Sequence, residues 1–92
     1  MDVTELLDKK QEYIESINNA RYKIAELRKT LVDMKAPLWE EATGTVDAKK
    51  DYIKSQTSDI QKQIDEFEAD IEWYYNMLQL VDDKLLYSGI DV

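Results

Sequence analysis

Residues 60–85 read IQKQIDEFEADIEWYYNMLQLVDDKL, and this stretch decides the fold. Apolar or aromatic residues recur along it at alternating intervals of four and three, at positions 60, 64, 67, 71, 74, 78, 81 and 85. That spacing is the heptad repeat of a helix that buries one narrow seam against another helix. The period-two alternation of a half-buried strand is absent, so the stretch predicts a long helix.

The same spacing continues toward the N-terminal side as far as Val46, with Lys50 and Thr57 as its polar members. It predicts a second helix over about 46–87. Thr43, Thr45 and Asp47 are the alternative N-caps, because Ser, Thr and Asp side chains accept bonds from the first helical N–H groups. Gly89 tolerates the left-handed conformation that ends helices, which leaves a short tail over 88–92.

An earlier seam has the same spacing and predicts the first helix over about 3–35. Eight of its nine members are apolar or aromatic: Leu6, Lys10, Tyr13, Ile17, Ala20, Ile24, Leu27, Leu31 and Met34. Asp2 or Thr4 could cap this helix. Pro37 lacks a backbone N–H and restricts the residue before it, so we expect the helix to stop there. The remaining bend, 36–45, contains Trp39 and Gly44.

A connection of that length brings two helices together antiparallel. The sequence therefore predicts an all-α fold: one domain over 1–92, a long antiparallel two-helix hairpin that resembles a coiled coil.

The two seams do not use all of the apolar residues. A second stripe lies beside the seam of the second helix, and further apolar residues lie beside the first seam near the N-terminus. A two-helix hairpin has no third layer to cover them, so we expect association with itself or with another helical protein, most simply into a four-helix bundle as a homodimer or heterodimer. The expected interface comprises Leu7, Ile14, Trp73, Met77, Leu80 and Tyr87.

Catalytic and cofactor chemistry finds little support in the composition. The chain has no Cys and no His, which removes thiol nucleophiles, thiolate metal sites and the usual general base. No glycine-rich phosphate loop is present. The sequence therefore predicts a protein that is not an enzyme, with no cofactor and no metal. It also lacks an apolar run of about 18 residues, so we expect no membrane span.

Charge is distributed unevenly. Twenty Asp and Glu against 12 Lys and Arg give a net charge of −8, which argues against direct nucleic-acid binding. Residues 59–92 alone carry nine acids and two bases. Five of the acids lie close together: Asp65, Glu66, Glu68, Asp70 and Glu72. We interpret them as a solvated acidic face. The alternative hypothesis is an acidic phage-type inhibitor that binds a host enzyme, for anti-defence or as a nucleic-acid mimic. A structural coiled-coil protein is a weaker alternative.

The stretch DMKAPLWEEATG, residues 33–44, resembles the bend of the ESAT-6-like or WXG100 family. Those proteins are small helical hairpins of type VII secretion, with Trp-x-Gly between their helices. Trp39 matches the family tryptophan, Glu41 stands where the family has Gly, and Gly44 follows three residues later. This departure points to the divergent accessory proteins of LXG toxins. The resemblance implies a secretion partner or substrate, or an adaptor that targets a toxin, with Trp39 packed at the bend.

The family also carries a Tyr-x-x-x-Asp/Glu export signal after its second helix. Tyr87 and Asp91 match that pattern at the corresponding place. The resemblance implies that a secretion ATPase reads these two residues. It implies a cytoplasmic protein that is secreted by a route independent of a signal peptide.

Overall fold

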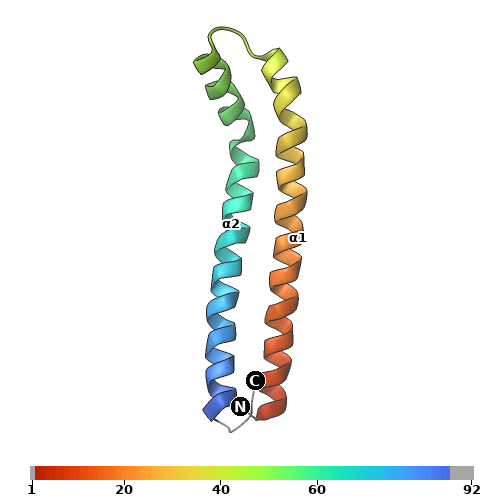
Figure 1. Cartoon of the computed structure of the whole chain (residues 1–92), viewed down its shortest axis with the longest axis vertical. Coiled ribbons are helices and arrows are strands. Elements are labelled where there is room, and N and C mark those ends of the chain that lie inside the picture. Colours follow the sequence, from red (N-terminus) through yellow and green to blue (C-terminus); the bar gives the residue numbers. More distant parts are fainter. Residues whose placement is uncertain (1, 88–92) are drawn as a thin grey trace.

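The structure, a computed structural model, describes residues 2–87, and these form two helices and no strand. Helix α1 spans Val3–Glu41 and helix α2 spans Val46–Tyr87. The two run antiparallel, with the start of α1 and the end of α2 at one end of the rod and the connection at the other (Figure 1). The molecule measures 64 × 17 × 16 Å. The two short dimensions fit a single pair of packed helices. The predicted all-α hairpin is confirmed.

The seams form the core. Apart from Ala42 in the connection, every buried residue among those described occupies a predicted seam position: Leu6, Ile17, Ala20, Ile24, Thr57, Ile64, Val81 and Leu85. At the end where α1 starts and α2 finishes, here called the open end, Leu6 packs with Val81 and Leu85. The opposite end, with the connection, is called the closed end. Because a pair of helices has only one contact line, this row of side chains supplies nearly all of the burial.

Both helices begin at predicted caps. The Asp2 side chain accepts a hydrogen bond of 2.8 Å from the backbone N–H of Glu5. Among the three alternatives for α2, Thr45 is the cap, since its Oγ1 accepts a bond of 3.2 Å from the backbone N–H of Ala48. Each bond satisfies one of the N–H groups that a helix start leaves without a partner.

The predicted end of the first helix at residue 35 is wrong, because α1 continues through Pro37 to Glu41. Pro37 and Asp33 are both exposed, so water can bond the Asp33 carbonyl that the proline leaves without a donor. Leu38 follows Met34 by four residues and is half-buried, so the seam continues past the proline. Packing of Leu38 offsets the single lost bond, and the bend shortens to residues 42–45.

Gly44 lies in this connection with φ at +96°. A Cβ there would lie 3.4 Å from the Ala48 Cβ, an ordinary contact, so the cost of a side chain is conformational. We expect Gly44→Ala to destabilise the hairpin by about 1 kcal/mol, and to lower Tm by about 4–8 °C. Thermal unfolding followed by circular dichroism measures this. Thr43→Ala, in the same loop but without a positive φ, should leave Tm nearly unchanged; an equal drop for both variants would contradict the conformational explanation.

Candidate interaction surfaces

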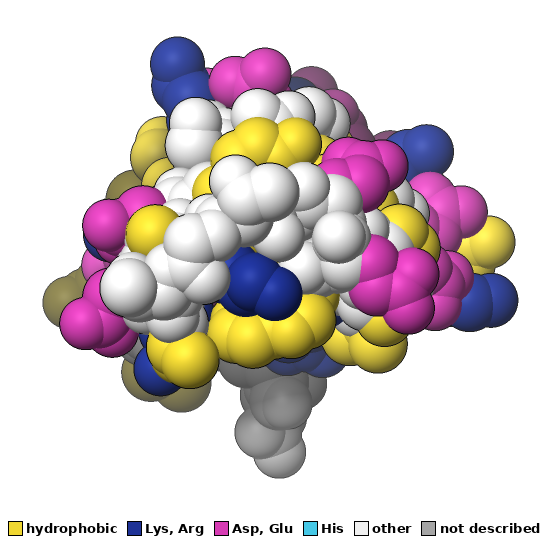
Figure 2. Space-filling view, turned by 90° about the horizontal axis from the view of Figure 1, so that it is seen from above, with side chains coloured by type: hydrophobic (Ala, Val, Ile, Leu, Met, Phe, Trp, Pro, Cys, Tyr) yellow, Lys and Arg dark blue, Asp and Glu magenta, His cyan; other side chains and the backbone are white. Residues whose placement is uncertain are grey.

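Apolar side chains are abundant on the surface of the described part of the chain. Eleven large hydrophobic residues are exposed there, whereas eight hydrophobic residues are buried. Figure 2 looks onto the closed end, where apolar side chains reach the surface between charged groups. The surplus predicted from the sequence is therefore present on the folded chain.

The first surface is the tryptophan flank, which comprises Trp73, Met77, Leu80 and Tyr87 of α2. Trp73 is 53% exposed and Leu80 is 51% exposed, while Met77 is half-buried. The Trp73 ring packs edge-on against Tyr13 of α1 and its neighbour Tyr74, with centroid distances of 6.0 and 5.3 Å. These contacts fix the indole orientation while about half of its surface stays open to a partner.

Leu7 and Ile14 do not lie on the tryptophan flank, although the sequence analysis grouped them with it. They precede Arg21 at intervals of seven, and Arg21 contacts Tyr75 of α2. Tyr75 and Trp73 are two residues apart, which is about 200° around a helix, so they lie on opposite sides of the hairpin. The six residues expected to form one interface are thus divided between two surfaces.

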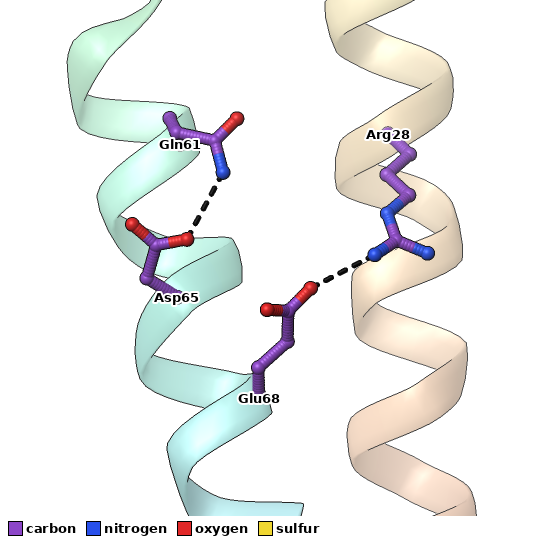
Figure 3. A network of polar contacts seen from close by, with 4 residues as sticks. All are labelled: Arg28, Gln61, Asp65 and Glu68. Atoms are coloured by element: carbon purple, nitrogen blue, oxygen red, sulfur yellow. Dashed lines mark hydrogen bonds and ion pairs between the residues drawn. The ribbon is translucent and has the colours of Figure 1, made fainter.

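The second surface is the arginine flank, on the other side of the seam. It comprises Leu7, Ile14, Arg21, Arg28 and Lys35 of α1, with Lys54, Gln61, Glu68, Tyr75 and Asp82 of α2. Polar contacts cross between the helices along it. Arg28 donates to Glu68 at 2.8 Å, and the side chains point toward one another in Figure 3. Arg21 donates to the Tyr75 hydroxyl, and the Arg21 Cζ lies 5.6 Å from the centroid of the Tyr75 ring.

Lys10 is the polar member of the first seam, and its Nζ lies 3.0 Å from Oδ1 of Asp82. That oxygen is buried and has no other hydrogen-bond partner, so the lysine charge is what compensates it. A polar pair that joins a seam lysine to a carboxylate beside the opposite seam costs stability but fixes the register of the two helices. We infer that this pair sets the register of α1 and α2 at the open end.

The bend residues lie apart from one another. Pro37 is exposed on α1, Trp39 lies in the last turn of α1, and Gly44 lies in the connection. The Lys49 Nζ sits 4.9 Å from the centroid of the Trp39 ring, a cation–π contact that ties the start of α2 to the end of α1. Trp39 therefore lies at the end of α1 and contacts the start of α2, outside the connection itself.

A groove of about 730 Å³, which was not predicted from the sequence, lies between the helices near the closed end; it is here called the lysine-rimmed groove. Apolar side chains form its floor: Leu31, Ala36, Trp39 and Ile53. Its charged lining residues are three lysines and one acid: Lys35, Lys50, Lys54 and Glu40. Lys50 and Thr57 occupy seam positions on α2 on either side of Ile53, where large apolar residues would fill this space. Those two interruptions of the seam were the available signal.

The five acids of the predicted acidic face are all exposed, but they wrap around α2 and do not share one face. Glu68 bonds to Arg28 across the hairpin, whereas Asp65 accepts from Gln61 on its own helix at 3.0 Å (Figure 3). Within residues 2–87 no group of three or more Asp or Glu is placed to hold a metal ion. These five acids therefore do not form one charged face.

Tyr87 is the last residue of α2 and is 92% exposed. Asp91, the other half of the predicted export signal, and the predicted tail lie outside the described residues. Neither helix of the described chain is both long and apolar enough to cross a membrane.

Comparison of the chain with protein-family models, curated proteins and solved structures gives no match.

Proposed function

We propose that this chain is a non-catalytic interaction protein, a preformed helical hairpin that binds another helical protein through its tryptophan flank. The observation that carries the proposal is that Trp73 and Leu80, two turns apart on one face of α2, are both about half-exposed. A tryptophan held in place by neighbouring rings while one side stays open is a typical interface anchor, because little side-chain entropy is lost on binding.

The partner is a helix or helical hairpin whose apolar side chains match the spacing of this flank. Trp73, Met77 and Leu80 follow one another at intervals of four and three, so a partner helix can pack along them as along a coiled-coil seam. Burying about 400 Å² of apolar surface at about 25 cal/mol per Å² is worth about 10 kcal/mol before the costs of association.

The biological role that we propose is that of a type VII secretion partner or an adaptor for an LXG toxin. Two observations support it: Trp39 packs in the last turn before the bend, and Tyr87 lies exposed at the end of the second helix. In this role the hairpin covers helical segments of the toxin and offers Tyr87 with Asp91 to the secretion ATPase.

We expect Trp73→Glu/Leu80→Glu to abolish the complex with a co-expressed helical protein encoded beside this chain, such as an LXG toxin segment. Two charges placed in an apolar interface would lose their hydration without gaining partners, which lowers affinity at least a hundredfold. Co-purification and isothermal titration calorimetry measure the loss, and circular dichroism shows that the helices remain.

The matched control is Tyr22→Glu/Val32→Glu. These two residues are 65% and 67% exposed, lie on α1 away from the tryptophan flank, and give the same change in net charge. The control should bind normally. Equal binding by both double variants would show that the tryptophan flank is not the contact surface.

A further inference from the structure

We propose that the arginine flank joins two copies of this chain, packed antiparallel, so that the open end of each copy fills the lysine-rimmed groove of the other. This flank lies on the opposite side of the hairpin from the tryptophan flank. The inference therefore stands apart from the proposed function, and the same hairpin can bind a second copy and a different partner together.

The spacing along α1 supports this arrangement. Helix α1 runs from Val3 to Glu41, so its midpoint is residue 22. Ile14 lies eight residues before the midpoint and Leu31, in the groove, lies nine residues after it. Leu7 lies fifteen residues before it and Trp39 seventeen after it. A two-fold axis through the middle of the flank therefore brings the apolar residues of the open end onto the apolar floor of the groove.

The spacing along α2 agrees. Leu6 packs with Leu85 and Lys10 pairs with Asp82, so residue 69 of α2 lies at about the level of residue 22 of α1. Asp82 lies thirteen residues after that level and Lys54 fifteen residues before it. The same two-fold axis places each Lys54 near Asp82 of the second copy. It also places Leu86, which is exposed, near Ile53 of the second copy.

Charge favours this orientation over the parallel one. A parallel pair would stack the groove lysines of one copy on those of the other, which is a like-charge contact in a partly desolvated groove. It would also set the open halves side by side. Residues 2–21 and 70–87, which belong to the open half, carry nine acids and four bases. The antiparallel pair separates these acidic halves and is a closed dimer.

The available surface is large enough for a stable dimer. One side of a rod of 64 by 16 Å offers about 1,000 Å² per copy, and the pair about 2,000 Å². Standard interfaces bury about 1,600 Å² in total, so a partial match along the flank already meets the requirement. The result is a four-helix bundle in which α1 packs on α1 of the second copy and α2 on α2.

Light scattering coupled to size exclusion, and sedimentation equilibrium, test the dimer with the full chain. We expect Lys50→Glu/Lys54→Glu to weaken dimerisation at least tenfold, because it places acids against the acidic open half. Lys29→Glu/Lys62→Glu makes the same change in net charge away from the flank and should dimerise normally. A wild-type chain that is monomeric at 100 μM, or a dimer that both double variants weaken equally, would overturn the proposal.

Disulfide trapping tests the orientation, since the natural chain has no cysteine. Leu7→Cys and Ala36→Cys chains, mixed and oxidised, should form the mixed disulfide, while each chain alone should not cross-link to itself. Self-cross-linking of Leu7→Cys without the mixed product would rule out the antiparallel dimer. Dimerisation that is lost in Trp73→Glu/Leu80→Glu and kept in Lys50→Glu/Lys54→Glu would overturn this inference and assign self-association to the tryptophan flank.

Discussion

Replacing Ile64 by alanine is expected to destabilise the hairpin by about 3 kcal/mol. Ile64 is 2% exposed and lies near the middle of α2, so the cavity left by its side chain cannot be filled by fraying of a helix end. Such changes cost about 2–5 kcal/mol, because the burial of the removed carbons is lost and a cavity remains. The better helix propensity of alanine offsets only a few tenths of a kcal/mol of this cost.

This loss should be a large part of the free energy of unfolding, because a domain this small is stable by only a few kcal/mol. Urea unfolding followed by circular dichroism at 222 nm measures it, at a protein concentration below that of self-association. Leu80→Ala is the control: it removes a similar side chain that is half-exposed on the tryptophan flank, and should cost less than about 1 kcal/mol. Equal costs at both positions would mean that the seam does not carry the stability.

The seam shows why the fold could be predicted from the sequence. A heptad repeat states which side of each helix is buried, and every described residue that is buried within a helix lies on it. The caps were also predictable, because Asp2 and Thr45 satisfy N–H groups by a local bond that needs no tertiary context. Local chemistry and periodicity pointed to the same hairpin.

The predictions that differ from the structure are those in which tertiary packing overrides a local sequence rule. Pro37 ends isolated helices, but here Leu38 continues the seam and both Asp33 and Pro37 are exposed, so α1 continues. Leu7 and Ile14 were grouped with Trp73 because all are apolar near one end of the rod. The side of the seam on which each residue lies becomes clear only when the two helices are placed in register. The contact between Arg21 and Tyr75 places them in register.

The lysine-rimmed groove leads to the second large expected effect, from Thr57→Leu. Thr57 is buried at a seam position, and its hydroxyl donates 2.8 Å to the carbonyl of Ile53 on its own helix. It thus places a small side chain where the seam has room for a larger one. Leucine would extend into the groove and cover Ile53, which we expect to stabilise the hairpin by about 1–2 kcal/mol.

The same change should oppose self-association, because a filled groove cannot receive the open end of a second copy. We expect Thr57→Leu to raise the urea midpoint of the isolated hairpin and to weaken dimerisation at least tenfold. Thr57→Val is the matched control: it keeps the shape of threonine and removes only the hydroxyl, so the groove and the dimer should persist. A leucine variant that is more stable and dimerises as well as the natural chain would show that the groove is only an underfilled seam. The opposite responses of stability and association would show that the sequence gives up packing at Lys50 and Thr57 in order to keep a place for another molecule.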